Sequence, residues 1–363
     1  MRIQDLIRAL LVGFAVTSLG CGSSTNDTVI AGNAAPSPLP SPLNLPSPLP
    51  TPLPRGNGLL YAQLSNSILR FSNPGSLAGN AAPQAAIAGN NTRIIALTDM
   101  VLDPAADRLY AANVADILVW DNVSTKSGNV PPDRLFNLGI PPFSVTYDGL
   151  RDVLYVGTTQ GVFKVFGASA ANGSLPSGLP LTGTIGGQSL FPFDMRLESA
   201  ANRLFVASCS TTSRPAAQVV AIFDNAFQAT GNSTFTPQTS ATNPFRTARD
   251  NAGRLVVNDA VEPIGPGIEM STQERILAFA SDVGGSPAPV LTITGAVQQR
   301  QLGAHGLTYD SNNDSMVVAN TDKLLFFDRF TTLTGSVAAS TARVLSLASF
   351  NSPCTVTAYD PSR

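Results

Sequence analysis

The sequence has little of what catalytic and metal sites are usually built from. It contains one histidine, His305, and three cysteines, Cys21, Cys209 and Cys354, in 363 residues. A zinc site with several histidine ligands is therefore excluded, and a Ser-His-acid triad would have to use His305. Neither Gly-x-Ser-x-Gly nor Gly-x-Gly-x-x-Gly occurs, so the nucleophile elbow and the dinucleotide-binding fingerprint are missing as well.

Charge is also scarce. Only 13% of the residues are charged, and 22 basic against 24 acidic residues give a net charge of −2. No basic surplus exists to neutralise a phosphate backbone, so we expect no nucleic-acid partner. The apolar run at residues 9–19 is too short to cross a bilayer as a helix, and no other segment is long enough.

Residues 1–21 have the pattern of a signal peptide. Arg2 and Arg8 make a basic start, the apolar run follows, and the segment ends at Gly20-Cys21. This end resembles the lipobox of bacterial lipoproteins, in which the cysteine is acylated and becomes the mature N-terminus. We therefore expect lipidation of Cys21 and a place in the bacterial cell envelope, at the outer membrane or on the periplasmic side. The alternative is an ordinary secretory signal with an incidental cysteine, which predicts a secreted protein.

Residues 22–58 are predicted to be a tether. Proline stands at nearly every second or third position of residues 36–56. Such a stretch favours extended polyproline II and acts as a semi-rigid spacer. We expect contact with the membrane only through the N-terminal lipid.

Residues 59–363 are predicted to form one domain from a repeated hairpin. Its clearest copy, residues 108–122, is an apolar run, a polar turn and a second apolar run that ends in Asp-Asn. An offset of seven residues between the runs recurs from Tyr61 to Ile68, Tyr110 to Ile117, Tyr155 to Val162 and Val317 to Leu324. Two more copies have longer loops, with insertions at residues 210–218 and 261–274.

A third apolar run precedes most hairpins and ends on an acid. These acids are spaced by 45, 50, 52 and 60 residues, and they are Asp103, Asp148, Glu198, Asp250 and Asp310. That period predicts four-stranded blades arranged in a ring, with the four aspartates capping turns. Residues 352–360 match a first strand, and residues 59–73 match a hairpin that lacks one. Pairing the two completes one blade from both ends, so we expect an all-β, six-bladed propeller of antiparallel blades.

The two insertions fall on the face where the inner strands begin, and a ligand site is expected on this face. The residues at the mouth of the central channel would be Thr98, Phe143, Phe193, Phe245, His305 and Cys354, followed by Asp99, Ser144, Asp194, Arg246, Gly306 and Thr355. One interpretation is a partly aromatic funnel with polar contacts from Asp99, Asp194, Arg246 and His305. The other is that the phenylalanines pack between blades and the charges are solvated.

Acids suited to Ca²⁺ are present near the same face, namely Asp99, Asp194, Glu262 and Glu269, but they lack EF-hand spacing. We otherwise expect no cofactor. Cys209 and Cys354 fall three blades apart, too far for a disulfide, so they are predicted to be free and buried thiols.

The repeats resemble those of NHL-type and related six-bladed propellers of bacterial surface and periplasmic proteins. The residues that carry the likeness are DRLYAANVADILVWDN, DVLYVGTTQGVFKVFG, NRLFVASC with VAIFDN, and NDSMVVANTDKLLFFD. Some relatives of this kind are metal-dependent lactonases, and others bind proteins or carbohydrates without chemistry. The resemblance concerns the fold more than the activity.

Two functions follow from these observations. The first is a lipid-anchored, monomeric scaffold that binds an envelope protein, glycan or small ligand, with no catalysis evident. The second is a Ca²⁺-dependent hydrolase or lactonase at the channel mouth. Convergence of three or more of Asp99, Asp194, Glu262, Glu269 and His305 on one point would favour the enzyme.

Overall fold

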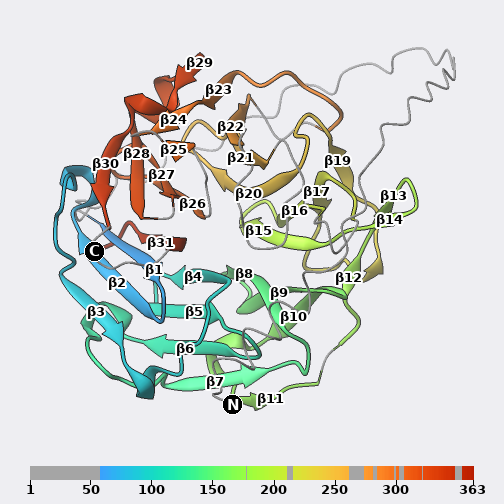
Figure 1. Cartoon of the computed structure of the whole chain (residues 1–363). Helices are drawn as coiled ribbons and strands as arrows, with labels where there is room; N and C mark the ends of the chain where they lie inside the picture. The colour runs from blue at the N-terminus through green and yellow to red at the C-terminus, as the bar shows by residue number, and fades with distance from the viewer. Residues whose placement is uncertain are drawn as a thin grey trace, which may run out of the picture.

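The structure, a computed structural model, describes residues 58–176, 178–210, 216–260, 274–280, 284–297, 300–301, 306–320, 322–347 and 354–363. Within these ranges the chain forms a ring of six small sheets, the blades, arranged about a centre (Figure 1). The regular structure of the described residues consists of strands and three-residue 3-10 helices. The prediction of an all-β, six-bladed propeller is confirmed. No helix among the described residues is long and apolar enough to span a membrane.

Each blade has four antiparallel strands that follow one another from the centre outward. Blade 1 has β31 (Cys354–Asp360), β1 (Leu59–Leu64), β2 (Ser67–Ser72) and β3 (Ala85–Ala88). Blade 2 has β4 (Asp99–Asp103), β5 (Arg108–Ala112), β6 (Ile117–Asp121) and β7 (Arg134–Asn137). Blade 3 has β8 (Pro142–Asp148), β9 (Val153–Thr158), β10 (Gly161–Phe166) and β12 (Leu181–Thr182).

Blade 4 has β15 (Pro192–Glu198), β16 (Arg203–Ser208), β17 (Val219–Asp224) and β19 (Thr236–Gln238). Blade 5 has β20 (Pro244–Arg249), β21 (Leu255–Ala260), β22 (Glu274–Phe279) and β23 (Leu291–Thr294). Blade 6 has β26 (Gly306–Asp310), β27 (Ser315–Asn320), β28 (Lys323–Asp328) and β30 (Arg343–Ser346).

The remaining elements lie between the blades' main strands. Two small hairpins are β13 (Thr184–Ile185) with β14 (Gln188–Ser189), and β24 (Ala296–Val297) with β25 (Arg300–Gln301). The short strands β11 (Gly173–Ser174), β18 (Gly231–Asn232) and β29 (Gly335–Ala338) each pair with the outer strand of the preceding blade. The 3-10 helices are η1 (Pro74–Ser76), η2 (Asn90–Thr92), η3 (Val123–Thr125), η4 (Ala168–Ala170), η5 (Phe330–Thr332) and η6 (Ala339–Thr341).

Blade 1 closes the ring with strands from both ends of the domain, as expected. Leu59 pairs with Asp360, and the antiparallel ladder runs on to the pair Leu64–Cys354. The register corrects one expectation. Thr158 pairs with Pro142 in blade 3, so Cys354 stands at the level of Pro142 and not at that of Phe143. The segment from Cys354 to Asp360 is as long as that from Pro142 to Asp148, so Cys354 is the equivalent of Pro142 even though it follows a proline.

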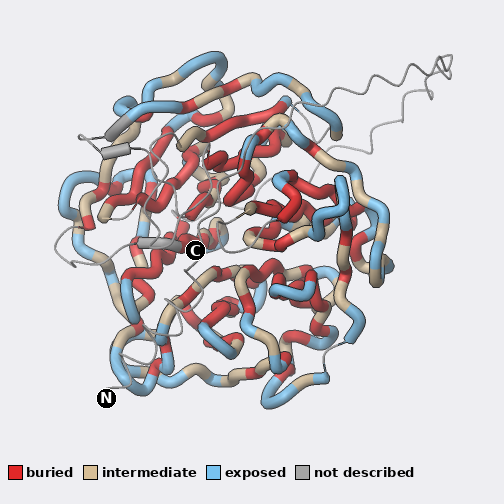
Figure 2. Tube along the Cα trace, turned by 45° about the vertical axis from the view of Figure 1, so that its right-hand side comes forward, coloured by how far each residue is buried: buried red, intermediate tan, exposed pale blue. Residues whose placement is uncertain are grey.

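The hydrophobic core lies between neighbouring blades. Between blades 1 and 2 it includes Tyr61, Leu109 and Trp120, each at most 1% exposed. Middle strands such as β1 are buried on both faces because each blade packs against two neighbours. Figure 2 shows this pattern, with burial along the inner and middle strands and exposure at the periphery. Cys209 is a buried, free thiol as predicted, and the side chain of Cys354 lies outside the described residues.

The acids that end the inner strands cap turns, as predicted. Asp250 Oδ1 accepts the N–H groups of Ala252 and Arg254, and Asp310 Oδ1 accepts those of Asn312 and Asn313, at 2.9–3.1 Å. These bonds satisfy backbone donors that the turn leaves free.

A second row of acids, four residues further on, has a role that the sequence did not indicate. Asp107, Asp152 and Asp314 have left-handed backbones, and each binds both the N–H and the hydroxyl of a residue 17 positions later: Ser124, Ser169 and Thr331. Each pair bonds the turn between the first and second strands to the turn after the third strand. These bonds hold the three strands together at one end of the blade.

Six glycines link the outer edges of the blades into a belt. Each lies between the third and fourth strands of its blade and bridges in parallel to the preceding blade: Gly79, Gly128, Gly173, Gly231, Gly285 and Gly335. All six have φ between 58° and 84°, which glycine adopts without strain. The belt covers strand edges that would otherwise be open to pairing with other chains.

Cationic side chains join neighbouring blades at the end of the ring that carries the turns between first and second strands. We call these contacts the cation clamp. A Lys or Arg side chain of one blade donates to carbonyls of the turn that follows the third strand of the next blade, which is a 3-10 helix in blades 1, 2, 3 and 6. The donors are Arg70, Arg134, Lys164, Arg254 and Arg343, for the junctions 1–2, 2–3, 3–4, 5–6 and 6–1. The turn of the junction 4–5 includes residues 281–283, which lie outside the described residues. Carbonyls at the end of a helical turn lack partners within it, so a cation there is stabilising.

Lys164 tests the strength of this clamp. Its Nζ donates to three carbonyls of blade 4, including that of Phe227 at 2.8 Å. Lys164→Met should lower the free energy of unfolding by about 1–3 kcal/mol, because charge-assisted bonds are lost and carbonyls are left unpaired. Urea unfolding followed by circular dichroism measures the change.

Lys126→Met is the matched control. Lys126 Nζ makes a surface ion pair with Asp133 at 2.9 Å, so its loss should change the stability by less than about 1 kcal/mol. Equal effects of the two substitutions would show that the clamp adds nothing to an ordinary surface charge.

Candidate functional site

The two faces of the ring differ. Gly58, where the described chain begins, donates its N–H to the carbonyl of Arg363 at 2.6 Å, beside the end of β31. We call this the tether face; it also carries the turns between first and second strands. The loop face carries the loops between second and third strands and the connections into the inner strands. The flanking strands β16–β17 and β21–β22 place both insertions there, although residues 211–215 and 261–273 lie outside the described residues.

Three of the predicted site residues lie at the centre of the loop face. Asp99, Asp194 and Arg246 stand at or near the start of β4, β15 and β20, and each is at most 7% exposed. Arg246 donates to Asp194 Oδ1 at 3.2 Å and to the carbonyl of Thr98 at 3.2 Å. Since Thr98 belongs to blade 2 and Arg246 to blade 5, this side chain connects opposite sides of the ring. Glu262, Glu269 and His305, the other predicted residues, lie outside the described residues.

Each of the two acids also binds the inner strand of the following blade. Asp99 Oδ2 accepts the N–H of Val145, and Asp194 Oδ2 accepts that of Thr247, both at 2.8 Å. These charges are therefore partnered within the protein, contrary to the interpretation that they are merely solvated. Both carboxylates therefore hold neighbouring inner strands together.

The predicted aromatic residues form a row of contacts. Ring centroids are 5.1 Å apart for Phe143–Phe191, 5.9 Å for Phe191–Phe193 and 4.2 Å for Phe193–Phe245. The Arg246 guanidinium lies 5.2 Å from the Phe245 ring and 5.5 Å from that of Phe193. Phe245 is buried, as the packing interpretation requires, whereas Phe143 and Phe193 are half-buried. Each of these three phenylalanines follows a proline at the start of its inner strand, and the pairing with the second strand shifts at this phenylalanine.

The convergence expected of a metal enzyme involves only two described residues, Asp99 and Asp194. Across the described ranges, no three His, Cys, Asp or Glu side chains gather as metal ligands would. Both carboxylates already accept main-chain N–H groups, and Asp194 also faces Arg246. A Ca²⁺ site remains a prediction that depends on residues outside the described ranges.

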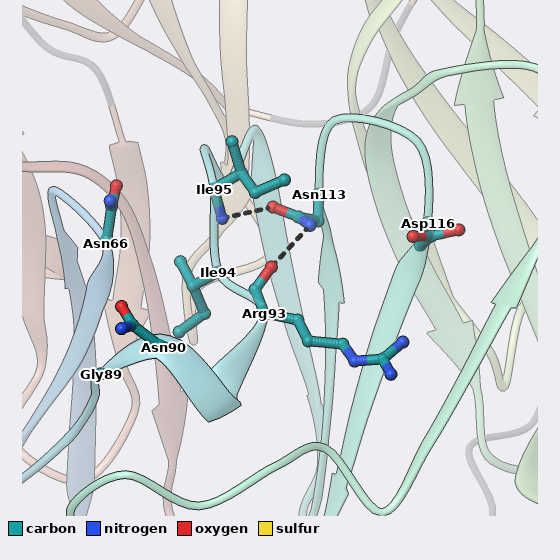
Figure 3. Close-up of a pocket in the computed structure, with 8 residues that line it drawn as sticks. All are labelled: Asn66, Gly89, Asn90, Arg93, Ile94, Ile95, Asn113 and Asp116. Carbon is teal, nitrogen blue, oxygen red and sulfur yellow. Dashed lines mark hydrogen bonds between the residues drawn. The ribbon is translucent and has the colours of Figure 1, made fainter. Parts of the chain in front are cut away.

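A pocket of about 460 Å³ opens on the loop face between blades 1 and 2. Three segments form it: the β1–β2 hairpin tip, the connection from β3 to β4, and the β5–β6 loop. Its lining residues are Asn66, Gly89, Asn90, Arg93, Ile94, Ile95, Asn113 and Asp116 (Figure 3). Its volume lies within the usual range for ligand sites, about 300–1,000 Å³.

Asn113 fixes one wall of this pocket. The side chain is 3% exposed; its Oδ1 accepts the N–H groups of Ile95 and Ala96 at 3.0 and 3.2 Å, and its Nδ2 donates to the Arg93 carbonyl at 3.1 Å. On the other side, Asn129 Oδ1 accepts the N–H of Asn91 at 2.7 Å. The connection between the blades is therefore held rigidly, although it has no long element of its own.

Four polar side chains around the pocket are free of partners among the described residues: Asn66, Asn90, Arg93 and Asp116. Arg93 has φ 59°, an uncommon backbone for a residue with a side chain. Figure 3 shows its guanidinium reaching along the pocket toward Asp116. Ile95 and Val114, 46% and 40% exposed, add apolar surface to the pocket and the adjoining loop. Sequence reasoning missed this site; the adjacent isoleucines in a connection between strands are the signal that could have indicated it, although only Ile95 is exposed and Ile94 packs into the core.

Comparisons with known proteins show no family for this chain. No protein-family model matches the chain, and no curated protein matches it either. Similar solved structures include the β-propeller domain of Cps50 (Swd1) from Myceliophteria thermophila, at 9% identity and a TM-score of 0.47, covering 80% of this chain and 84% of that one. A chain of a nidogen/laminin complex has 10% identity and a TM-score of 0.49, with coverage of 84% and 99%. A chain of the COPII outer coat vertex on membranes has 12% identity and a TM-score of 0.47, with coverage of 76% and 74%. The NHL type expected from the repeats stays a prediction.

The central cluster predicts an unusual pH dependence of stability. Burial and the nearby Asp194 raise the pKa of Asp99 to about 7, with Arg246 opposing the rise. An unfolded Asp titrates near 4, so the folded protein binds the extra proton between about pH 4 and 7. This contribution to stability is present at low pH and is lost as the pH rises through 7. From pH 5 to pH 8 the loss should be about 3 kcal/mol.

Asp99→Asn removes this titration. The variant should therefore lose less stability than the wild type between pH 5 and pH 8, whatever its stability at either pH. Urea unfolding of both proteins at the two pH values measures the difference. Parallel pH profiles would show that Asp99 titrates normally.

Proposed function

We propose that the protein is a lipid-anchored propeller of the bacterial cell envelope that binds a protein partner through its loop face. The observation that supports this most is the placement of the tether and the pocket on opposite faces. Residues before Gly58 join the domain at the tether face, where Gly58 is fixed to Arg363. The pocket between blades 1 and 2 and both insertions are on the loop face. Anchored in this way, the domain directs its loop face away from its attachment.

The chemistry of the loop face suits binding. The pocket combines free amide, guanidinium and carboxylate groups with the exposed aliphatic side chain of Ile95, on a connection held by Asn113. Groups that are already held in place lose little freedom when a partner binds, so more of the contact energy appears as affinity. A proline-rich tether, at about 3 Å per residue, would hold this surface tens of ångströms from the membrane.

Ile95 and Leu150 provide a matched pair to test the binding face. Ile95 borders the pocket, and Leu150, 71% exposed, lies in a turn of the tether face. Ile95→Asp should reduce the recovery of cross-linked partners from envelope extracts at least tenfold, because an apolar contact is replaced by a charge. Leu150→Asp should leave the recovery unchanged. Equal recovery with both variants would place the binding surface elsewhere.

The anchor is tested by Cys21→Ser. Lipid attachment needs the cysteine thiol, so the variant should move from the membrane fraction to the soluble fraction when cells are fractionated and immunoblotted. A wild-type protein that is already soluble would favour the ordinary secretory signal instead.

A further inference from the structure

The unpartnered groups of the pocket between blades 1 and 2 define the class of ligand that it can take. Arg93 supplies donors for a carboxylate at one position. Asn66 and Asn90 each carry a donor and an acceptor, the complement of a peptide unit. Ile95 supplies an exposed aliphatic surface between these groups, and the buried Ile94 supports it from the core.

Other ligand classes fit this lining less well. A free phosphate carries about two negative charges and a nucleic acid one per nucleotide, more than the one arginine here can pair with beside Asp116, whereas a single carboxylate matches that arginine. A divalent cation would find a single carboxylate there. A sugar ring would find no aromatic side chain among the lining residues to stack on. An extended peptide uses all the groups present, since its amides match the asparagines and its side chains match Arg93 and Ile95.

We propose that this pocket binds an extended peptide segment in which an acidic side chain stands next to an aliphatic one. The acidic side chain pairs with Arg93, and a main-chain amide of the peptide bonds to Asn66 or Asn90. Asp116 accepts an N–H from the segment, and the aliphatic side chain packs on Ile95. This inference rests on the proposed binding function and specifies the part of the partner that is recognised.

The geometry explains why Arg93 can act as the anchor. Its backbone is left-handed, and Nδ2 of the buried Asn113 binds its carbonyl at 3.1 Å. The preceding turn is fixed as well, because Thr92, fully buried, donates its hydroxyl to the carbonyl of Gly89 at 2.7 Å. The main chain is thus set before the ligand arrives, and the guanidinium is left exposed.

The test is selection from a displayed library of random twelve-residue peptides on the full-length protein, with parallel selection on Arg93→Ala. Peptides enriched on the wild type alone should carry Asp or Glu beside Ile, Leu or Val. Their affinity, measured by fluorescence polarisation, should fall about tenfold or more in Arg93→Ala. It should also fall in Asn66→Ala.

Arg329→Ala is the control. Arg329 is also an exposed arginine with a left-handed backbone, at φ 51°, but it follows β28 on the tether face. Its substitution should leave peptide affinity unchanged. Enrichment of the same peptides on wild type and Arg93→Ala, or no enrichment on either, would overturn the proposal. If partner capture still depended on Ile95 in that case, the binding function would stand and only the peptide class would be wrong.

Discussion

The bond between a cationic side chain and the free carbonyls of the next blade's turn is the interaction on which the ring depends. Each blade is a four-stranded sheet that cannot bury its two faces alone, so its stability comes from its neighbours. Arg70, Lys164 and Arg254 extend this dependence from apolar packing to polar bonding at the tether face. These carbonyls lie at the end of a tight turn, where bonds within the turn leave acceptor capacity; that of Phe330 accepts the N–H of Leu333 as well as the Arg254 guanidinium. Packing, clamp and glycine belt together fix the angle between one blade and the next.

Fixed angles between blades make the candidate site possible. The pocket is formed by two blades and the connection between them, and it exists only while these keep their positions. At the centre of the same face, Arg246 connects blade 5 to blade 2 through the carbonyl of Thr98. The charged residues at the centre of the ring differ from those of the pocket in their burial. The central residues are buried and bonded to one another, whereas the polar groups of the pocket face outward, so the pocket is the better place for a partner.

The fold could be predicted from the sequence because its repeats are local. Two apolar runs seven residues apart make a hairpin wherever they occur, and the aspartate that ends a first strand caps the turn that follows; blade 4 has Glu198 instead, which pairs with Arg249. Closure by residues 354–360 was predictable because the missing strand and the spare strand complement each other. The belt glycines were visible as Gly-Asn and Gly-Ser pairs, but only the structure shows that they bridge to the preceding blade.

The clamp and the pocket were not predictable for a physical reason. The clamp donors come from different strands in different blades, from β10 for Lys164 and from β30 for Arg343, so they share a place in space but not a position in the repeat. The pocket combines the tips of two regular hairpins with the connection from β3 to β4, which the repeat does not describe. At the channel mouth, the register of the repeats placed Asp99, Asp194 and Arg246 near the start of the inner strands. It could not show that Asp194 pairs with Arg246 or that both acids accept main-chain N–H groups.

The central claim is that the ring is one closed unit, with the terminal strands as firmly held as the internal ones. Hydrogen–deuterium exchange read by mass spectrometry tests it most directly, by comparing peptides that cover β1 and β31 with peptides that cover β5 and β9. Closure predicts that all four exchange at the slow rate of global unfolding, because the Leu59–Asp360 ladder is continuous with the core of blades 1 and 2. Exchange of β1 and β31 at a rate ten or more times faster than β5 and β9 would contradict the account, since the ring would then open at its ends.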